Sequence, residues 1–177
     1  MSERETIEKV KERQGIFDKI QDVLTLGYGT KESLRELDKK LRDFYYADFK
    51  ALRHRWEEIY LAALNAGQKA TGDHFKKVIQ VLDRVAEKVN RADYGYAGLW
   101  DRKGSVREKE LAHIFNYDKA LDSDVKAITN AVDELYSDCE DEKWGDVKAK
   151  VKNVKSLILD FESKWNEREK EFRPLEM

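Results

Sequence analysis

The fold is decided by residues 144–172, WGDVKAKVKNVKSLILDFESKWNEREKEF. Apolar side chains recur here at alternating intervals of three and four residues, and the pattern misses one position, at Arg168. This spacing predicts a heptad seam, the apolar face with which one amphipathic helix packs against another. Ser137 and Glu140 form a capping-box pattern ahead of the seam, and Pro174 follows it. We therefore expect a helix over 140–172, with these seam residues: Trp144, Val147, Val151, Val154, Ile158, Phe161, Trp165 and Phe172.

A second seam lies directly before the first, and it also contains one polar residue. Asp118 occupies the position that should be apolar. The Asp-Ser-Asp stretch at 122–124 could cap a new helix, yet the heptad phase is unchanged across it, so the pattern favours one continuous helix over 105–137. Its seam residues are Leu111, Ile114, Leu121, Val125, Ile128, Val132 and Leu135.

The N-terminal half contains three more amphipathic stretches, which predict helices over 2–26, 30–66 and 72–92. The second would be about 55 Å long. The tight connection Gly27-Tyr28-Gly29 places the first two antiparallel. We expect an all-α fold, namely an elongated bundle of about five amphipathic helices, three of them long, with heptad-like antiparallel packing in one domain over 1–177.

Composition and charge exclude several classes of protein. Charged residues make up 40% of the chain, against about 25% in typical domains. The net charge of −2 provides no global field for a polyanion or an anionic membrane, so any nucleic-acid site would have to be local. No apolar run approaches the roughly 18 residues that a membrane span needs. The single cysteine and the charged N-terminal sequence lead us to expect a cytoplasmic protein.

One motif is compatible with a metal. Glu110 and His113 match the Glu-x-x-His pattern of di-metal helical bundles, in which both side chains reach one ion from the same helix face. A dinuclear site needs a second such pair, which the sequence lacks. The alternative is that His113 lies beside the seam with its ring satisfied by a carboxylate or a carbonyl. We therefore expect no metal and no cofactor.

Two acids are candidates for buried polar groups. An acid at the seam position of Asp118 costs stability unless it is paired, specifies a register, or is turned toward water by a local bend. The sequence does not decide among these three explanations. Asp48 lies among aromatic and basic residues, where structural pairing is favoured over a catalytic carboxyl group of raised pKa. Cys139 lies among acids that disfavour its thiolate. These observations favour a protein without enzymatic activity.

The stretch 93–104 escapes helical periodicity and is the best candidate for partner binding. Aromatic and arginine side chains together are typical of interface hot spots. The alternative is that this loop folds back and caps the bundle. The candidate residues are Tyr94, Tyr96, Leu99, Trp100 and Arg102.

The sequence thus favours a non-enzymatic interaction or scaffolding module that binds a protein partner or itself, through apolar helix seams and the 93–104 loop. One alternative is a metal-binding bundle around Glu110 and His113. Another is a nucleic-acid-associated protein that uses the basic positions Lys39, Lys40, Arg42, Lys50, Arg53 and Arg55.

Overall fold

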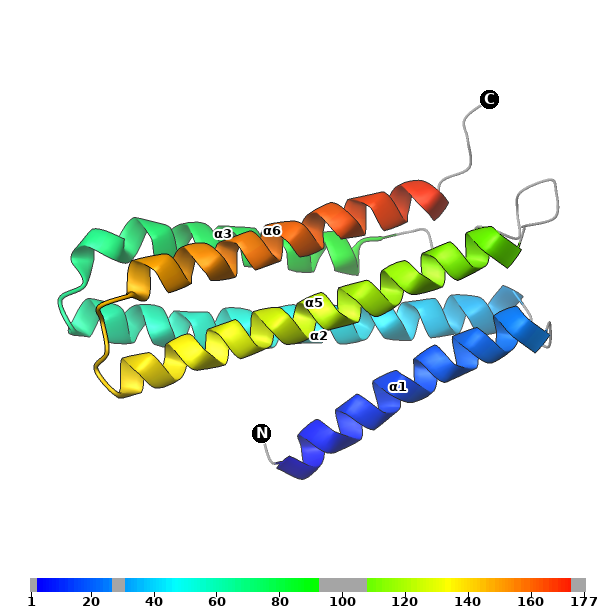
Figure 1. Ribbon diagram of the computed structural model, residues 1–177, viewed down its shortest axis with the longest axis horizontal. Coiled ribbons are helices and arrows are strands. Elements are labelled where there is room, and N and C mark those ends of the chain that lie inside the picture. The colour runs from blue at the N-terminus through cyan, green and yellow to red at the C-terminus, as the bar shows by residue number, and fades with distance from the viewer. Residues whose placement is uncertain (1–2, 27–30, 93–107, 173–177) are drawn as a thin grey trace.

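The computed structural model describes residues 3–26, 31–92 and 108–172, and over these residues the chain is helical, without strands (Figure 1). The fold is an all-α bundle of five helices, as the sequence predicts. The helices are α1 (Glu3–Leu26), α2 (Lys31–Asn65), α3 (Gly72–Asn90), α5 (Glu108–Glu140) and α6 (Val147–Phe172), with a short 3-10 turn, Lys69–Thr71, before α3.

Four helices form the body of the bundle as two antiparallel hairpins. In the hairpin of α5 and α6, ion pairs join early residues of one helix to late residues of the other, as expected for opposite directions. In the hairpin of α2 and α3, Arg53 pairs with Asp83, and the Trp56 indole donates to the Phe75 carbonyl at 3.1 Å. The hairpins lie side by side with α2 against α5 and α3 against α6, so that these neighbours run parallel (Figure 1).

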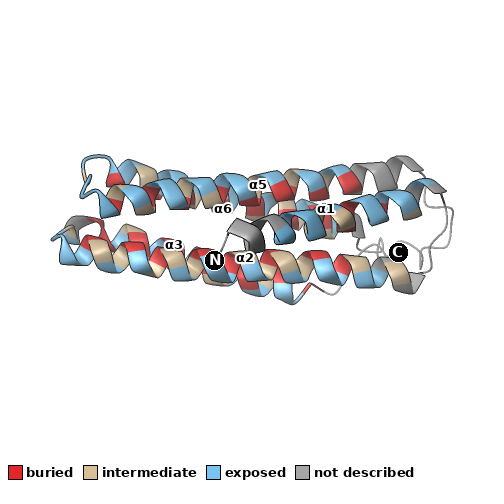
Figure 2. Cartoon of the chain, turned by 90° about the horizontal axis from the view of Figure 1, so that it is seen from below, coloured by how far each residue is buried: buried red, intermediate tan, exposed pale blue. Residues whose placement is uncertain are grey.

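The described seam residues are buried inside this four-helix body, apart from half-buried Trp144. In Figure 2 the buried residues, in red, follow the inward faces of the helices. Tyr45, Phe49 and Phe161 are fully buried, and their rings pack edge to face, with centroids 4.8 Å apart for Phe49 and Phe161. Trp56 and Trp165 are also fully buried, and Trp144 is half-buried. The apolar stripes are therefore largely covered by the chain itself.

The start of α6 differs from the prediction. Helix α6 begins at Val147 rather than near 140, and Ser137 and Glu140 lie in the last turns of α5 instead of capping the next helix. Glu142 takes a left-handed conformation (φ 56°), and the Lys143 amide donates to the Asp138 carbonyl at 2.8 Å. These contacts form a Schellman motif that ends α5. Glycine usually signals such an end, and here glutamate occupies its position.

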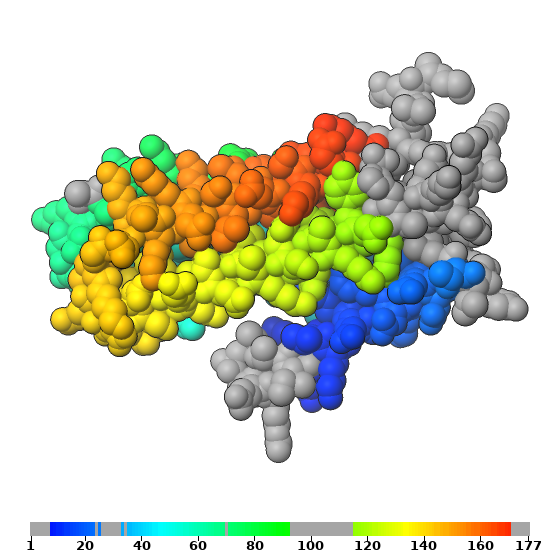
Figure 3. Space-filling view, viewed as in Figure 1, coloured from blue at the N-terminus to red at the C-terminus, as the bar shows by residue number. Residues whose placement is uncertain are grey.

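Helix α1 is an addition to the body rather than part of it. It lies against α2 and α5 at one end of the bundle, and its described buried side chains are Ile16, Phe17 and Ile20. Val10 continues the same helix face but is 48% exposed. In the space-filling view α1 projects below the other helices instead of lying along them (Figure 3). The N-terminal half of α1 thus leaves the bundle, and its apolar face is left partly uncovered.

Candidate functional site

A layer of ionic side chains crosses the bundle core. The fully buried guanidinium group of Arg168, from α6, donates to Asp118 of α5, and its Nη2 donates to Asp38 of α2 at 2.7 Å. Arg42 donates to the same Asp38 through Nε at 3.0 Å and to the Ala92 carbonyl through Nη1. We call Asp38, Arg42, Asp118 and Arg168 the ionic layer. Its contacts join α2, α5 and α6 to the chain just beyond the end of α3.

The ionic layer has the properties of a structural element. Asp118 and Arg168 are both 0% exposed, so neither meets solvent. Of the alternatives open for Asp118, the structure shows the paired one, without a bend that turns it to water. The Asp38 and Asp118 carboxylates both accept hydrogen bonds from the Arg168 guanidinium. This arrangement supports packing rather than chemistry.

A second ionic cluster joins α1 to the body. Arg13 of α1 lies between Asp48 of α2 and Asp122 of α5, and its Nη1 donates to Asp122 Oδ1 at 2.9 Å. Its guanidinium carbon also lies 5.4 Å from the centre of the Phe44 ring. Burial raises the pKa of Asp48 above its ordinary value, although Arg13 opposes this shift. Asp48 is therefore a partner of Arg13, the structural role that the sequence favours for it.

The Cys139 thiol is held in its protonated form. Burial, with a smaller contribution from Asp138, raises the pKa of this thiol to about 11. A nucleophilic cysteine needs a lowered pKa. The sequence indicates the same direction from the surrounding acids, but burial is the larger cause.

Most of the basic positions proposed on α2 are neutralised by carboxylates. Lys40 pairs with Glu36 at 2.9 Å, and Arg42 belongs to the ionic layer. Arg53 and Arg55 have carboxylate partners on their own helix and on neighbouring helices. Lys39 and Lys50 are exposed. Four of these six positions therefore face acids, and the segment does not present a continuous positive surface.

Several predicted site residues lie outside the described part of the chain. They are the 93–104 candidates Tyr94, Tyr96, Leu99, Trp100 and Arg102, together with the side chains of Glu110 and His113. Among the residues that are described, no group of three or more His, Cys, Asp or Glu side chains could hold a metal ion. Within the same residues, no helix is long and apolar enough to cross a membrane.

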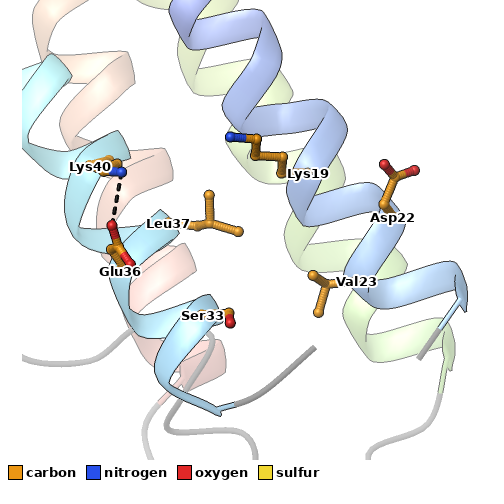
Figure 4. Close-up of a pocket in the computed structure, with 7 residues that line it drawn as sticks. All are labelled: Lys19, Asp22, Val23, Ser33, Glu36, Leu37 and Lys40. Atoms are coloured by element: carbon orange, nitrogen blue, oxygen red, sulfur yellow. Dashed lines mark ion pairs between the residues drawn. The ribbon is translucent and has the colours of Figure 1, made fainter. Parts of the chain in front are cut away.

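A groove between α1 and α2 is the feature that sequence reasoning missed. Two adjoining hollows, of about 320 Å³ and about 210 Å³, share Lys19, Leu37 and Lys40 in their walls. Leu37 and Val23 face each other across the first hollow, and Lys19 reaches from α1 toward α2 (Figure 4). We call this feature the α1–α2 groove. Its complete lining is Glu12, Gly15, Ile16, Lys19, Asp22, Val23, Ser33, Glu36, Leu37 and Lys40.

The rim of the α1–α2 groove carries both signs of charge. On the α2 side, Glu36 and Lys40 form an ion pair, drawn as the dashed line in Figure 4. This pairing lowers the pKa of Glu36 and raises the pKa of Lys40. The groove thus combines partly exposed apolar side chains with a charged rim, the composition of a surface that binds another polypeptide.

Comparisons of the chain with protein-family models, with curated proteins and with solved structures gave no match.

Proposed function

We propose that this protein is a non-enzymatic interaction module that holds an amphipathic helix of a partner protein in the α1–α2 groove. The observation that carries the proposal is the partial exposure of apolar side chains between α1 and α2. Val23 of α1 and Leu37 of α2 are half-buried in the groove, whereas the described core residues of the four-helix body, such as Leu135 and Val151, are buried. A partner helix would cover this remaining apolar surface.

The buried polar groups support a binding role over catalysis. Asp38, Asp48 and Asp118 are each held by an arginine, and the Cys139 thiol is protonated at neutral pH. A catalytic acid, base or nucleophile needs a group that is free to change its protonation state during turnover. The three carboxylates are instead engaged by arginine side chains, and Cys139 is not a thiolate.

The dimensions and chemistry of the groove suit a helix. Its α1 wall runs from Glu12 to Val23, which corresponds to about 17 Å of helix, or three turns. A docked helix presents apolar side chains along one face at that spacing. The hollows accommodate those side chains, and charges flanking the apolar face of the partner meet Lys19 and Asp22 on the rim. These properties lead us to propose an amphipathic helix with charges of both signs beside its apolar stripe.

The proposal is tested by selecting binders and mapping where they bind. Amphipathic helical peptides are selected from a displayed library against the full chain, and the best are titrated into the ¹⁵N-labelled protein. We expect amide shifts centred on Ile16, Val23 and Leu37. The variants Val23→Lys and Leu37→Lys should weaken binding at least about tenfold, because each places an ammonium group among the apolar contacts.

The control variants change leucines of the outer surface. Leu61 is 59% exposed and Leu159 is 38% exposed, and neither lines the groove. Leu61→Lys and Leu159→Lys should leave peptide affinity unchanged. Selected peptides that map to another surface, or that lose affinity equally in both pairs of variants, would contradict the proposal. If the full chain forms a dimer that Leu37→Lys dissociates, the partner helix belongs to a second copy.

A further inference from the structure

Two neighbouring helices each contain a stretch without acidic residues toward the same end of the bundle, which in α3 follows Asp73. In α3 the acid-free stretch is 74–82, and in α6 it is 147–159. The two helices run parallel and begin at the same end, beside each other (Figure 1). Their acid-free stretches therefore lie together, and the two stretches contain six lysines: Lys76, Lys77, Lys148, Lys150, Lys152 and Lys155.

The contacts between the helices show which of these lysines share one face. Arg84 of α3 makes two hydrogen bonds to Glu162 of α6, at 3.0 Å and 2.6 Å. Residues seven apart lie on the same face of a helix. Lys77 lies seven residues before Arg84 on α3, and Lys155 lies seven residues before Glu162 on α6. Lys77 and Lys155 therefore occupy corresponding positions along the boundary between α3 and α6. Lys148 lies a further seven residues back on α6, and Lys152 lies between them.

Among the described residues, many surface cations, such as Arg53 and Lys164, pair with a carboxylate. Lys150, from the acid-free stretch of α6, turns toward α5 and pairs with Glu134 and Asp138. In the described part of the chain, Lys77, Lys148, Lys152 and Lys155 form no such pair. Lys148 and Lys152 are four residues apart on one helix, where like charges repel. An anionic ligand would relieve this repulsion. We call these four residues the lysine face.

We propose that the lysine face binds the phosphate backbone of duplex nucleic acid without reading its sequence. A duplex carries one negative charge per ~1.7 Å of its axis. The seven residues from Lys148 to Lys155 span about 10 Å of helix, so several phosphates lie within reach of the four ammonium groups. Lysine acts as a point charge toward phosphate, and contacts confined to the phosphate backbone do not read the base sequence.

The surroundings of the lysine face favour nucleic acid over a protein or a membrane. The exposed residues of the same two stretches include Gln80, Asn153 and Ser156, which can donate hydrogen bonds to phosphate oxygens. Leu159, at 38% exposure, is the large apolar side chain exposed within these stretches. Protein interfaces need an apolar core, and membrane-surface helices need a broad apolar face. The α1–α2 groove lies elsewhere, so this proposal is independent of the proposed function.

Acidic residues on the next helix would orient the bound duplex. Residues 133–142, at the end of α5 and in the turn after it, contain six acids and no lysine or arginine: Asp133, Glu134, Asp138, Glu140, Asp141 and Glu142. This stretch lies at the same end of the bundle, on the side of α6 opposite to α3 (Figure 1). Four of these acids pair with Arg55, Lys143 or Lys150, but the six acids still outnumber these three cations. The stretch therefore repels phosphates and restricts the duplex to the α3 side of α6.

The test is fluorescence anisotropy of a short labelled DNA duplex titrated with the full chain between about 50 mM and about 200 mM salt. Four phosphate contacts predict a slope of about −3.6 for log affinity against log salt, which amounts to a loss of about a hundredfold over that range. Lys148→Gln/Lys152→Gln should halve the slope and lower the affinity at low salt at least about tenfold. Both side chains are exposed, so circular dichroism and thermal melting should be unchanged.

The matched control is Lys39→Gln/Lys50→Gln, which removes the same charge from two exposed lysines of α2. We expect it to retain the slope and the affinity of the wild type, as should the groove variant Leu37→Lys. The proposal is overturned if the wild type does not bind duplex at low salt, or if the control pair weakens binding as much as the test pair. Binding of phosphatidylserine vesicles or of polyglutamate in preference to duplex would overturn it as well.

Discussion

Replacing Arg168 with methionine tests whether the ionic layer stabilises the bundle. The substitution keeps the length and apolar stem of the side chain but removes the charge that Asp38 and Asp118 share. Loss of one partner from a buried ion pair costs about 3–5 kcal/mol, because the remaining charge is buried without a counterion. Arg42 still pairs with Asp38, so we expect the lower end, about 3 kcal/mol. For a chain of this size, that lowers the Tm by about 6–12 °C.

The assay is urea unfolding at neutral pH, followed by circular dichroism and by tryptophan fluorescence. Trp165 is a suitable reporter because the Arg168 guanidinium lies 4.9 Å from the centre of its ring. The control is Lys164→Met on the same helix. Lys164 pairs with Asp124 at 2.8 Å but is 42% exposed, and such pairs contribute about 1 kcal/mol or less.

A double-mutant cycle with Asp118→Asn separates the ion pair from general packing. Removing both charges leaves fewer buried groups unpaired than removing Arg168 alone. We therefore expect the free energy of unfolding to fall in the double variant by about 1–3 kcal/mol less than the sum of the losses in the two single variants. Equal losses for Arg168→Met and Lys164→Met, or strictly additive effects in the cycle, would show that water reaches Arg168 and that our reasoning about its burial is wrong.

Three further predictions concern other parts of the chain. Glu142→Gly should raise the free energy of unfolding by about 1 kcal/mol in urea titrations, because glycine adopts the left-handed conformation without steric cost. The Cys139 thiol should react with a disulfide reagent at pH 8 at least about a hundredfold more slowly than in the urea-unfolded chain, since its pKa is about 11. The pKa of Glu162 lies below its ordinary value of 4.5, chiefly because Arg84 donates hydrogen bonds to this carboxylate. The stability that ionised Glu162 adds is therefore fully present above pH 4.5 and is lost as the pH falls through the lowered pKa. Glu162→Gln should therefore be less stable than wild type by about 1 kcal/mol at neutral pH, with the difference shrinking in acid, when unfolding is compared across pH.

The helices could be predicted from the sequence because their seams are long and regular. The two irregular positions were visible as well, since Arg168 interrupts one seam and Asp118 the other. The structure shows that these two residues form one ion pair. Periodicity identifies the face of a helix that is buried but not the helix that covers it, so the pairing could not be derived from the spacing alone.

The features that sequence reasoning missed depend on tertiary contacts or on an unusual residue. The sequence does not signal the end of α5, because the usual signal for a Schellman motif is glycine, as at Gly67 after α2, and here Glu142 occupies that position. In the sequence Asp38 is followed by Lys39 and Lys40 and resembles an ordinary surface acid, and only the fold places Arg168 of α6 beside it. The α1–α2 groove depends on the angle at which α1 leaves the bundle, which no local pattern encodes.

The ionic layer also limits how α5 and α6 can be misaligned. A heptad seam repeats every seven residues, so sliding one helix by a heptad returns apolar side chains to apolar neighbours and costs the core little. Such a slide would place Arg168 opposite Leu111 or Val125, the seam positions seven residues on either side of Asp118. The buried arginine would then lack a counterion, at a cost of about 3–5 kcal/mol. Of the nearly equivalent axial registers that the seams permit, the ionic layer selects one.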